Sequence, residues 1–356
     1  MLIKNLVLQN FRSFGKKEFT FSEETTIIVG PNTAGKTNIL EAISLLSTGK
    51  SFRASVEAEM IKSTEEVGRV MCEAGGGDEG EVGLEVVVTR GELNGEKIPR
   101  KKLMINETPK RFYDFVGTLK TVLFGPWDVD LVTGSPSARR RFLDSVCSQV
   151  DREYRRSLLS YEKGVRQRNK LLQRIREGEA KRSQLMFWDQ LLIKNGEYLT
   201  HVREEFIDFV NMTEPLDSEE LSLEYDRSTI SPARIKEYEA EEVAAGATLV
   251  GPHRDDFGFR AQGIGNSAQE KRNLAIYGSR GEQRMVVLWL KLAELAFIDG
   301  KSGSRPVLLL DDVFSELDHK HREEVMKTIG RQQTIITTAD PHTIEEWRKS
   351  AQIIEL

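Results

Sequence analysis

TTIIVGPNTAGKTNIL, residues 25–40, is the stretch that decides the fold. Its apolar start is typical of a buried strand, and residues 30–37 fit the phosphate-loop pattern G-x-x-x-x-G-K-S/T, which needs a strand before it and a helix after it. Glycines let the backbone curl so that its N–H groups, together with the positive end of the next helix, face an anion. The stretch therefore predicts a nucleotide phosphate site in an α/β domain.

Each residue of this loop is expected to take part in binding the nucleotide. Lys36 supplies a mobile cation to the outer phosphates, and we count it among the catalytic residues as well. The hydroxyl of Thr37 is placed to hold Mg²⁺. The predicted nucleotide contacts of the loop are Gly30, Pro31, Asn32, Thr33, Ala34, Gly35, Lys36, Thr37 and Asn38.

A second part of the site is predicted near the other end of the chain, in PVLLLDD, residues 306–312. An apolar strand that ends in acids brings a carboxylate to the edge of a sheet, beside the phosphate loop. Asp311 would then hold Mg²⁺, mainly through its water shell, and Asp312 would orient or deprotonate the attacking water. Many strands end in Asp, so this interpretation depends on the phosphate loop being present as well.

YGSRGEQR, residues 277–284, stands just before an apolar run and predicts the start of a long helix. Ser279, Gly281 and Gln283 would form a second anion-binding helix end. One nucleotide cannot easily be enclosed by two helix ends of the same chain, so we expect a head-to-tail homodimer on ATP binding, with two nucleotides at its interface. The same residues also fit a capping box, with Ser279 as N-cap and Glu282 three residues later.

The charge of the chain is unevenly distributed. The 356 residues carry a net charge of −5, yet residues 137–182 hold fourteen lysines and arginines against six acidic residues. Apolar residues recur there every three or four positions as far as residue 165, and a second helix is expected from about 183 to 210 after a break at 177–179. This pattern predicts a basic helical arm, residues 136–213, inserted between head segments 1–135 and 214–356.

The basic arm is a candidate surface for a polyanion, although a solvated helix face would show the same charges. We see no base-reading motif, so binding should depend on charge and be sensitive to salt. The residues predicted to contact DNA phosphates are Arg139, Arg140, Arg141, Arg152, Arg155 and Arg156, with Arg166, Arg168 and Lys170 in the same cluster.

Other features limit the class of protein. The longest apolar run after residue 280 is broken by Lys291 and Glu294, so no membrane span is expected. No signal peptide is recognisable at residues 1–11, and the expected location is the cytoplasm. Cys72 and Cys147 lack metal-site spacing and are interpreted as buried apolar residues in a reducing compartment. Phe187 and Trp188 are expected in the core of the arm.

The order of GPNTAGKT, SRGEQR and LLLDDVFSELD resembles the ABC-type ATPase head of the SMC and RecF group. NFRSF (residues 10–14), GSPSARRRFLD (134–144) and LVGPHRDDF (249–257), together with the short arm, are most similar to the RecF family. The resemblance spans nearly the whole chain and implies a discontinuous ABC-type P-loop head with an inserted helical arm. The family usually shows Pro-Glu-Asp where this chain has residues 126–128 as Pro-Trp-Asp.

The resemblance also implies several site roles. Asp318 would lie in a loop across the dimer interface, Thr338 would act as the switch residue at the γ-phosphate, and Arg12 would lie near the adenine. His253 and Arg254 of the 249–257 motif would lie near the site. Glu282 stands where glutamine is common, which changes the charge of the predicted interface.

The function that the resemblance implies is a slow, DNA-stimulated ATPase of recombinational repair that clamps duplex DNA near gaps or single-strand/duplex junctions. It would support RecA loading together with RecR and RecO. Two alternatives remain open at this point. One is an ATP-binding DNA scaffold without productive hydrolysis. The other is a transporter ATPase subunit, which the long separation of Lys36 from Ser279 disfavours.

Overall fold

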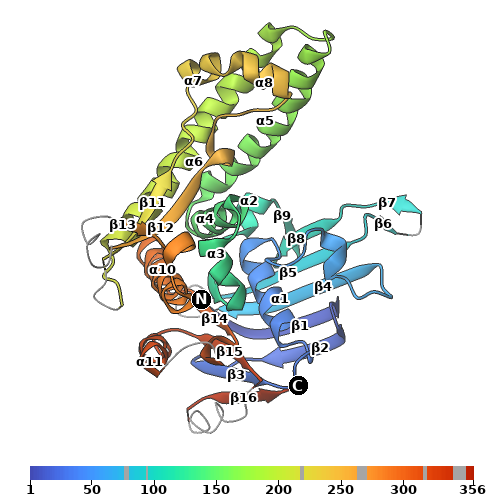
Figure 1. The fold of residues 1–356 in the computed structure, drawn as a ribbon. Coiled ribbons are helices and arrows are strands. Elements are labelled where there is room, and N and C mark those ends of the chain that lie inside the picture. The colour runs from blue at the N-terminus through green and yellow to red at the C-terminus, as the bar shows by residue number, and fades with distance from the viewer. Residues whose placement is uncertain (76–79, 94, 217–219, 263–270, 316–318, 340–349) are drawn as a thin grey trace. The chain divides into compact units, whose positions relative to one another are not determined.

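The computed structural model describes residues 1–75, 80–93, 95–216, 220–262, 271–315, 319–339 and 350–356. The chain divides into two compact units: unit 1 comprises Met1–Asp128 and Glu294–Leu356, and unit 2 comprises Val129–Ala293 (Figure 1). The predicted discontinuous head with an inserted segment is confirmed, because both ends of the chain build unit 1. Unit 2 extends beyond the predicted arm and includes the beginning of the signature helix.

Unit 1 contains a six-stranded antiparallel sheet in the order β2-β1-β4-β5-β8-β9. In β1 the residues Ile3, Leu6, Leu8 and Phe11 are buried, and a register shift near Asn5 accounts for the break in alternation between Ile3 and Leu6. The short strands β6 and β7 pair with each other in a separate antiparallel ribbon. The strands are β1 (Leu2–Phe11), β2 (Phe14–Thr20), β4 (Val67–Gly75), β5 (Glu81–Thr89), β6 (Glu92–Leu93), β7 (Glu96–Lys97), β8 (Lys101–Ile105) and β9 (Thr108–Lys110).

The second sheet of unit 1 is parallel and has the order β10-β14-β15-β3-β16. Every residue of its three central strands is buried, which is why their sequences read as continuous apolar or threonine-rich runs instead of alternating ones. Because the strands are parallel, the carboxyl ends of β14, β15 and β3 meet at one edge. The strands are β3 (Thr25–Val29), β10 (Thr121–Phe124), β14 (Val307–Asp311), β15 (Thr334–Thr338) and β16 (Gln352–Glu355).

Helix α1 (Lys36–Thr48) packs against both sheets and is buried almost all round. Its apolar residues Ile39, Ile43 and Leu46 join the core of unit 1, and Gly49, with φ 66°, caps the end of the helix. The buried amide of Gln333 connects the two sheets: it accepts from Ile3 N at 2.7 Å and donates to Ile3 O at 2.7 Å. The other helices of unit 1 are η1 (Glu57–Met60), α2 (Phe112–Phe115), η3 (Pro126–Val129, which crosses into unit 2), η7 (Val313–Ser315) and α11 (His319–Thr328).

The arm is built by α4 (Pro136–Val150), α5 (Arg152–Arg176), η4 (Arg182–Leu185) and α6 (Met186–Met212), with α3 (Asp130–Thr133) before them. Helices α5 and α6 lie side by side, and a Cβ at Gly164 would lie 2.7 Å from Leu191, so glycine permits this close approach (Figure 1). The helix expected to continue through residue 165 is interrupted. Asp151 is extended, and its carboxylate caps α5 by accepting from Glu153 N and Tyr154 N at 2.7 and 3.0 Å.

The rest of unit 2 contains a small antiparallel sheet, β11-β12-β13, and the helix that begins at the signature. Phe187, expected in the arm core, is instead 62% exposed near the start of α6, whereas Leu185 is buried and Trp188 is half-buried. In the described residues no helix is long and apolar enough to cross a membrane. The remaining elements are β11 (Leu221–Asp226), α7 (Pro232–Glu237), α8 (Glu239–Ala245), η5 (Pro252–Arg254), β12 (Asp256–Gln262), β13 (Lys271–Asn273), α9 (Leu274–Tyr277) and α10 (Arg280–Ser302).

Candidate functional site

The loop between β3 and α1 has the conformation that a phosphate loop requires. Gly35 has φ 102°, a left-handed conformation in which a side chain is strained, and it directly precedes the first turn of α1. Lys36 is buried, and its Nζ donates to the carbonyls of Gly30 at 2.7 Å and Pro31 at 3.0 Å. The ammonium group is thus held over the loop. The N–H groups at the start of α1 come next in the chain and can bind an anion.

The structure brings Thr37 and Asp311 together from opposite ends of the chain. Thr37 Oγ1 donates to Asp311 Oδ2 at 2.7 Å, and the hydroxyl of Thr337 donates to Asp311 Oδ1. Asp311 is 5% exposed, so its charge is held in a largely dry environment by these two hydroxyls. One carboxylate and one hydroxyl at the phosphate loop are hard oxygen donors, so this pair fits Mg²⁺ by ligand type.

Asp312 and Thr338 lie at the same edge of the parallel sheet. Asp312 has φ 52°, a strained conformation for a residue other than glycine, and its N–H donates to Thr337 O at 3.0 Å. Thr338 is buried at the end of β15, next to the last residue of β3. Asp318 lies outside the described residues, so its predicted role at the dimer interface stays a prediction.

Arg12 stands in the turn between β1 and β2, close to the phosphate loop. Its Nε and Nη2 donate to the Glu41 carboxylate of α1 at 2.9 and 2.5 Å. The next two residues of the turn face Gly35, where a Cβ would lie 3.0 Å from Ser13 Oγ and 2.8 Å from the Phe14 ring. The predicted placement of Arg12 near the nucleotide thus has a structural basis, although its contact with adenine stays a prediction.

The signature residues form the capping box that the sequence offered as an alternative. Ser279 N donates to Glu282 Oε2 at 2.7 Å, and Glu282 N donates to Ser279 Oγ at 3.3 Å. An ion pair with Arg272, aided by the Ser279 amide, lowers the pKa of Glu282 to about 2. Ser279 and Gly281 are exposed, and a Cβ at Gly281 would meet only the Ser279 hydroxyl, at 3.9 Å. This helix end is therefore both capped and open to approach.

Gln283, also predicted to contact the nucleotide, is directed into its own unit. Its Nε2 donates to Leu274 O at 3.0 Å and to Gly278 O at 3.3 Å, which fixes the loop before α10. The structure therefore supports a role for Gln283 in shaping the signature loop.

The six arginines predicted to contact DNA separate into two sets. Arg139 is 8% exposed and pairs with both oxygens of Asp256 at 2.6 and 2.9 Å, and Arg155 is 7% exposed and donates to Ser148 O at 2.5 Å. Arg140 is partly buried and donates to Asp255 O at 2.8 Å. The exposed set is Arg141, Arg152 and Arg156. Arg139, Arg140 and Arg155 make contacts inside unit 2, so the DNA surface that we propose below comprises the exposed set alone.

Arg168, also predicted to belong to the basic cluster, lies in the interior of the arm. It is 1% exposed, its Nε donates to Asp189 at 2.7 Å, and its Nη2 donates to Glu242 at 2.6 Å. Charge alone did not distinguish this buried arginine from its exposed neighbours, because both kinds occur on the same helix.

Sequence analysis missed the role of Arg203, which is 2% exposed and joins the two motifs of unit 2. It pairs with Asp144 of the 134–144 motif and with Asp255 of the 249–257 motif, at 2.8 Å each. Tyr154 and the carbonyl of Pro252 complete its contacts. The partners are at least 49 positions away in the sequence, so no local pattern could have revealed them.

His253 and Arg254, expected near the site through the family motif, make internal contacts in unit 2. His253 Nε2 lies 3.0 Å from Thr248 O and must donate to it, so Nδ1 accepts from the Tyr161 hydroxyl at 2.8 Å. This is the neutral form of the ring, and burial lowers the pKa of His253 to about 4. Arg254 donates to the same Thr248 carbonyl at 3.2 Å. Both residues therefore fix the 248–254 segment within unit 2.

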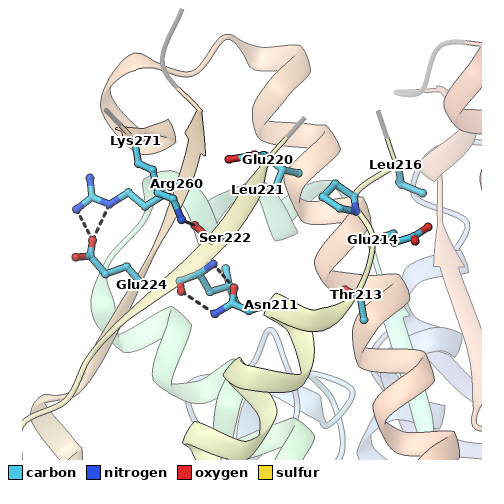
Figure 2. A pocket seen from close by; sticks show the side chains of 12 residues that line it. Asn211, Thr213, Glu214, Leu216, Glu220, Leu221, Ser222, Glu224, Arg260 and Lys271 are labelled. Carbon is cyan, nitrogen blue, oxygen red and sulfur yellow. Dashed lines mark hydrogen bonds and ion pairs between the residues drawn. The ribbon is translucent and has the colours of Figure 1, made fainter. Parts of the chain in front are cut away.

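A wide pocket of about 1110 Å³ lies in unit 2 where α6 ends beside β11 and β12 (Figure 2). Asn211 exchanges two hydrogen bonds with the backbone of Leu223, and Arg260 pairs with Glu224 at 2.6 Å. The pocket contains none of the residues predicted to bind nucleotide or DNA, and these polar groups satisfy one another.

Comparisons with known proteins agree with this architecture. The chain matches the family model of the RecF/RecN/SMC N-terminal domain over residues 2–355. It is 37% identical to the DNA replication and repair protein RecF of Herpetosiphon aurantiacus over 96% of this chain and 94% of that protein. It is similar to the solved structure of the recombination mediator protein RecF with ATP, with a TM-score of 0.84 and 32% identity over 95% of this chain and 92% of that one.

The Smc head domain of Pyrococcus furiosus, with an extended coiled coil and the C-terminal domain of ScpA, shares the fold. Its TM-score is 0.51 and its identity 19%, over 97% of this chain and 91% of that one.

Proposed function

The chain belongs to the RecF/RecN/SMC N-terminal domain family and, within it, to the RecF proteins, and from this membership we propose that it is an ATP-dependent DNA-binding protein of recombinational repair. The observation that carries the proposal is the 2.7 Å hydrogen bond between Thr37 and Asp311. It joins the phosphate loop to the acidic strand end, the two halves that an ABC-type ATPase needs in one place.

In this proposal ATP binds with its phosphates on the N–H groups of residues 30–37, and Lys36 neutralises the outer phosphates. Thr37 and Asp311 would hold Mg²⁺, which supplies charge neutralisation at the phosphates. Asp312 receives the proton of the attacking water, and Thr338 orients the γ-phosphate side of the site. The strained backbone of Asp312 supports such a role, since strain of this kind clusters at functional sites.

Two copies would share each nucleotide. The exposed start of α10, with Ser279 and Gly281, would close over ATP that the other copy holds by Lys36. The capping box does not oppose this role, because the Ser279 hydroxyl and the remaining N–H groups at the helix end still favour an anion. ATP binding would therefore assemble the head-to-tail dimer, and slow hydrolysis would separate it.

The assembled dimer would hold duplex DNA near gaps. Arg141, Arg152 and Arg156 are exposed on α4 and α5 and would contact phosphates without reading bases. The related solved structure is of a mediator in the RecFOR pathway, and we extend this to partners: RecR, with RecO, would bind the DNA-bound dimer and support RecA loading.

The test is a gel-shift titration of duplex, single-stranded and gapped DNA with ATP, ADP or no nucleotide, at two salt concentrations. We expect tight DNA binding only when ATP is present. With ATP, the affinity for DNA should be highest for gapped duplex and should fall at the higher salt concentration. Equal binding in all three nucleotide states, or unchanged binding by Lys36→Met, would refute the proposal. A scaffold without productive hydrolysis would bind in the same way and release no phosphate.

A further inference from the structure

Glu41 is a carboxylate with no exposed surface, on the second turn of the helix that follows the phosphate loop. Arg12 holds both of its oxygens, with N–O distances of 2.9 and 2.5 Å. The Ser51 hydroxyl donates to the same carboxylate at 2.5 Å, and Arg53 Nη1 lies 3.9 Å from it. Burying a charge is costly unless it is fully paired, and these groups provide the pairing.

Glu41 connects two loops that are far from it in sequence. Arg12 belongs to the β1–β2 turn, where it has φ 52°, and its Nη1 also donates to Glu59 O at 2.6 Å. Ser51 and Arg53 belong to the loop that leaves the far end of α1. A strained arginine in one loop and a half-exposed arginine in the other thus share one buried partner.

Both loops also contact Asn38, the residue that follows the phosphate loop in sequence. The Asn38 side chain donates to Ser13 Oγ at 3.1 Å and accepts from Arg53 Nη1 at 3.1 Å. The turn that contains Arg12 also faces Gly35 through Phe14. The Glu41 carboxylate is therefore linked, directly or through one arginine, to the side chains of both loops that lie beside the beginning of α1.

We propose that Glu41 is a positioning residue of the nucleotide site. It fixes the guanidinium groups of Arg12 and Arg53 and, through Arg53, the amide of Asn38, in the orientation in which they receive ATP. The inference rests on the proposed function and refines it, since it concerns how the same site is organised before ATP arrives. Groups held in place in advance lose less freedom when the ligand binds, so the expected effect is on affinity.

The experiment measures ATP affinity by calorimetry, and KM and kcat for phosphate release, in the full chain. Glu41→Gln keeps the shape of the side chain and removes its charge; we expect a Kd and a KM for ATP about tenfold higher and a kcat within about twofold of wild type. Glu65→Gln is the matched control, because Glu65 accepts from Asn10, two positions before Arg12, at 3.1 Å, and the structure shows no hydrogen bond or ion pair between Glu65 and Arg12.

Arg12→Gln and the double variant test whether Glu41 acts through Arg12. We expect the double variant to lose less ATP affinity than the two single variants together, since Glu41 and Arg12 share their contacts and only the part that acts through Arg53 is independent of Arg12. If Glu41→Gln does not fold, Arg12→Lys replaces it: lysine keeps the charge but cannot span both carboxylate oxygens, so the same rise in KM is expected.

Wild-type affinity in Glu41→Gln, a loss confined to kcat, or additive losses in the double variant would overturn the inference. Failure of the wild-type chain to bind ATP would refute the proposed function instead, so the two failures are distinguishable.

Discussion

Thr37 Oγ1 lies 2.7 Å from Asp311 Oδ2, although 274 positions separate the two residues in the chain. This contact places the end of the strand β14 at the beginning of α1 and defines the Mg²⁺ site that we propose. Thr37→Val should therefore raise the Kd for ATP about tenfold when Mg²⁺ is present and have little effect in EDTA. Calorimetry in the two buffers measures both. Thr37→Ser keeps the hydroxyl and should bind as wild type does; a loss equal to that of Thr37→Val would contradict the assignment.

Asp312→Asn tests the proposed base. The amide cannot take a proton from water, so kcat for ATP hydrolysis should fall about a hundredfold or more while ATP affinity stays the same. Light scattering should then show that the variant remains dimeric after ATP is added, whereas the wild type returns to monomers as ATP is consumed. Unchanged turnover would remove Asp312 from the mechanism.

Ser279→Arg tests the signature helix as part of the interface. An arginine at this exposed position should block closure, so the dimer formed with ATP should disappear while each monomer still binds ATP. Loss of the cap alone costs about 1 kcal/mol. Ser279→Ala removes the same cap without adding bulk and should keep the dimer at saturating ATP. If both variants lose the dimer equally, fraying of the helix would explain the result and the steric interpretation would be wrong.

The exposed and buried arginines of the arm should behave differently when mutated. Replacing Arg141, Arg152 and Arg156 by alanine should weaken duplex DNA binding and reduce the slope of log K against log salt by about one unit for each lost phosphate contact. Thermal stability should change little. Arg139→Ala should instead destabilise the protein by about 3 kcal/mol, because it leaves Asp256 without its bidentate partner. A normal salt slope in the triple variant would exclude this surface.

His253 should make stability depend on pH below neutrality. Its pKa is lowered to about 4 in the folded protein, so between pH 6.5 and 4 the unfolded chain binds a proton that the folded chain does not. Stability should therefore fall as the pH decreases through this window, by up to about 3 kcal/mol. His253→Gln should flatten this part of a denaturant-midpoint profile. Parallel profiles for wild type and His253→Gln would contradict this account.

The nucleotide site was predictable because its signals are local. The phosphate loop, the apolar strand before Asp311 and the Ser279 cap each lie within about ten residues, and each chain segment has the structure that its pattern predicts. The break at Asp151 also has a local signal, because an aspartate at this position can cap the turn that follows it. The apolar spacing continues across Asp151, however, and on its own predicts one unbroken helix.

The interior of the arm could not be predicted from charge. Arg168 and Arg203 can be buried because they form ion pairs with carboxylates from distant segments. Glu242 pairs with Arg168, and Asp255 pairs with Arg203. Nothing in the local sequence separates such an arginine from exposed Arg156, since helical periodicity identifies the apolar face and does not show which charged residues are covered by another element.

The most direct test of the shared nucleotide site mixes two inactive chains. Lys36→Met cannot hold ATP, and Ser279→Arg cannot close over it, so each chain alone should hydrolyse no ATP above background. In a mixed dimer one site has an intact Lys36 from one copy and an intact Ser279 from the other. The substituted position 279 faces the second site, which the Lys36→Met copy leaves without ATP, so no nucleotide is there for the added side chain to clash with. We predict that ATPase activity appears on mixing. No activity in the mixture, or full activity of Ser279→Arg alone, would contradict the claim that two copies share each triphosphate.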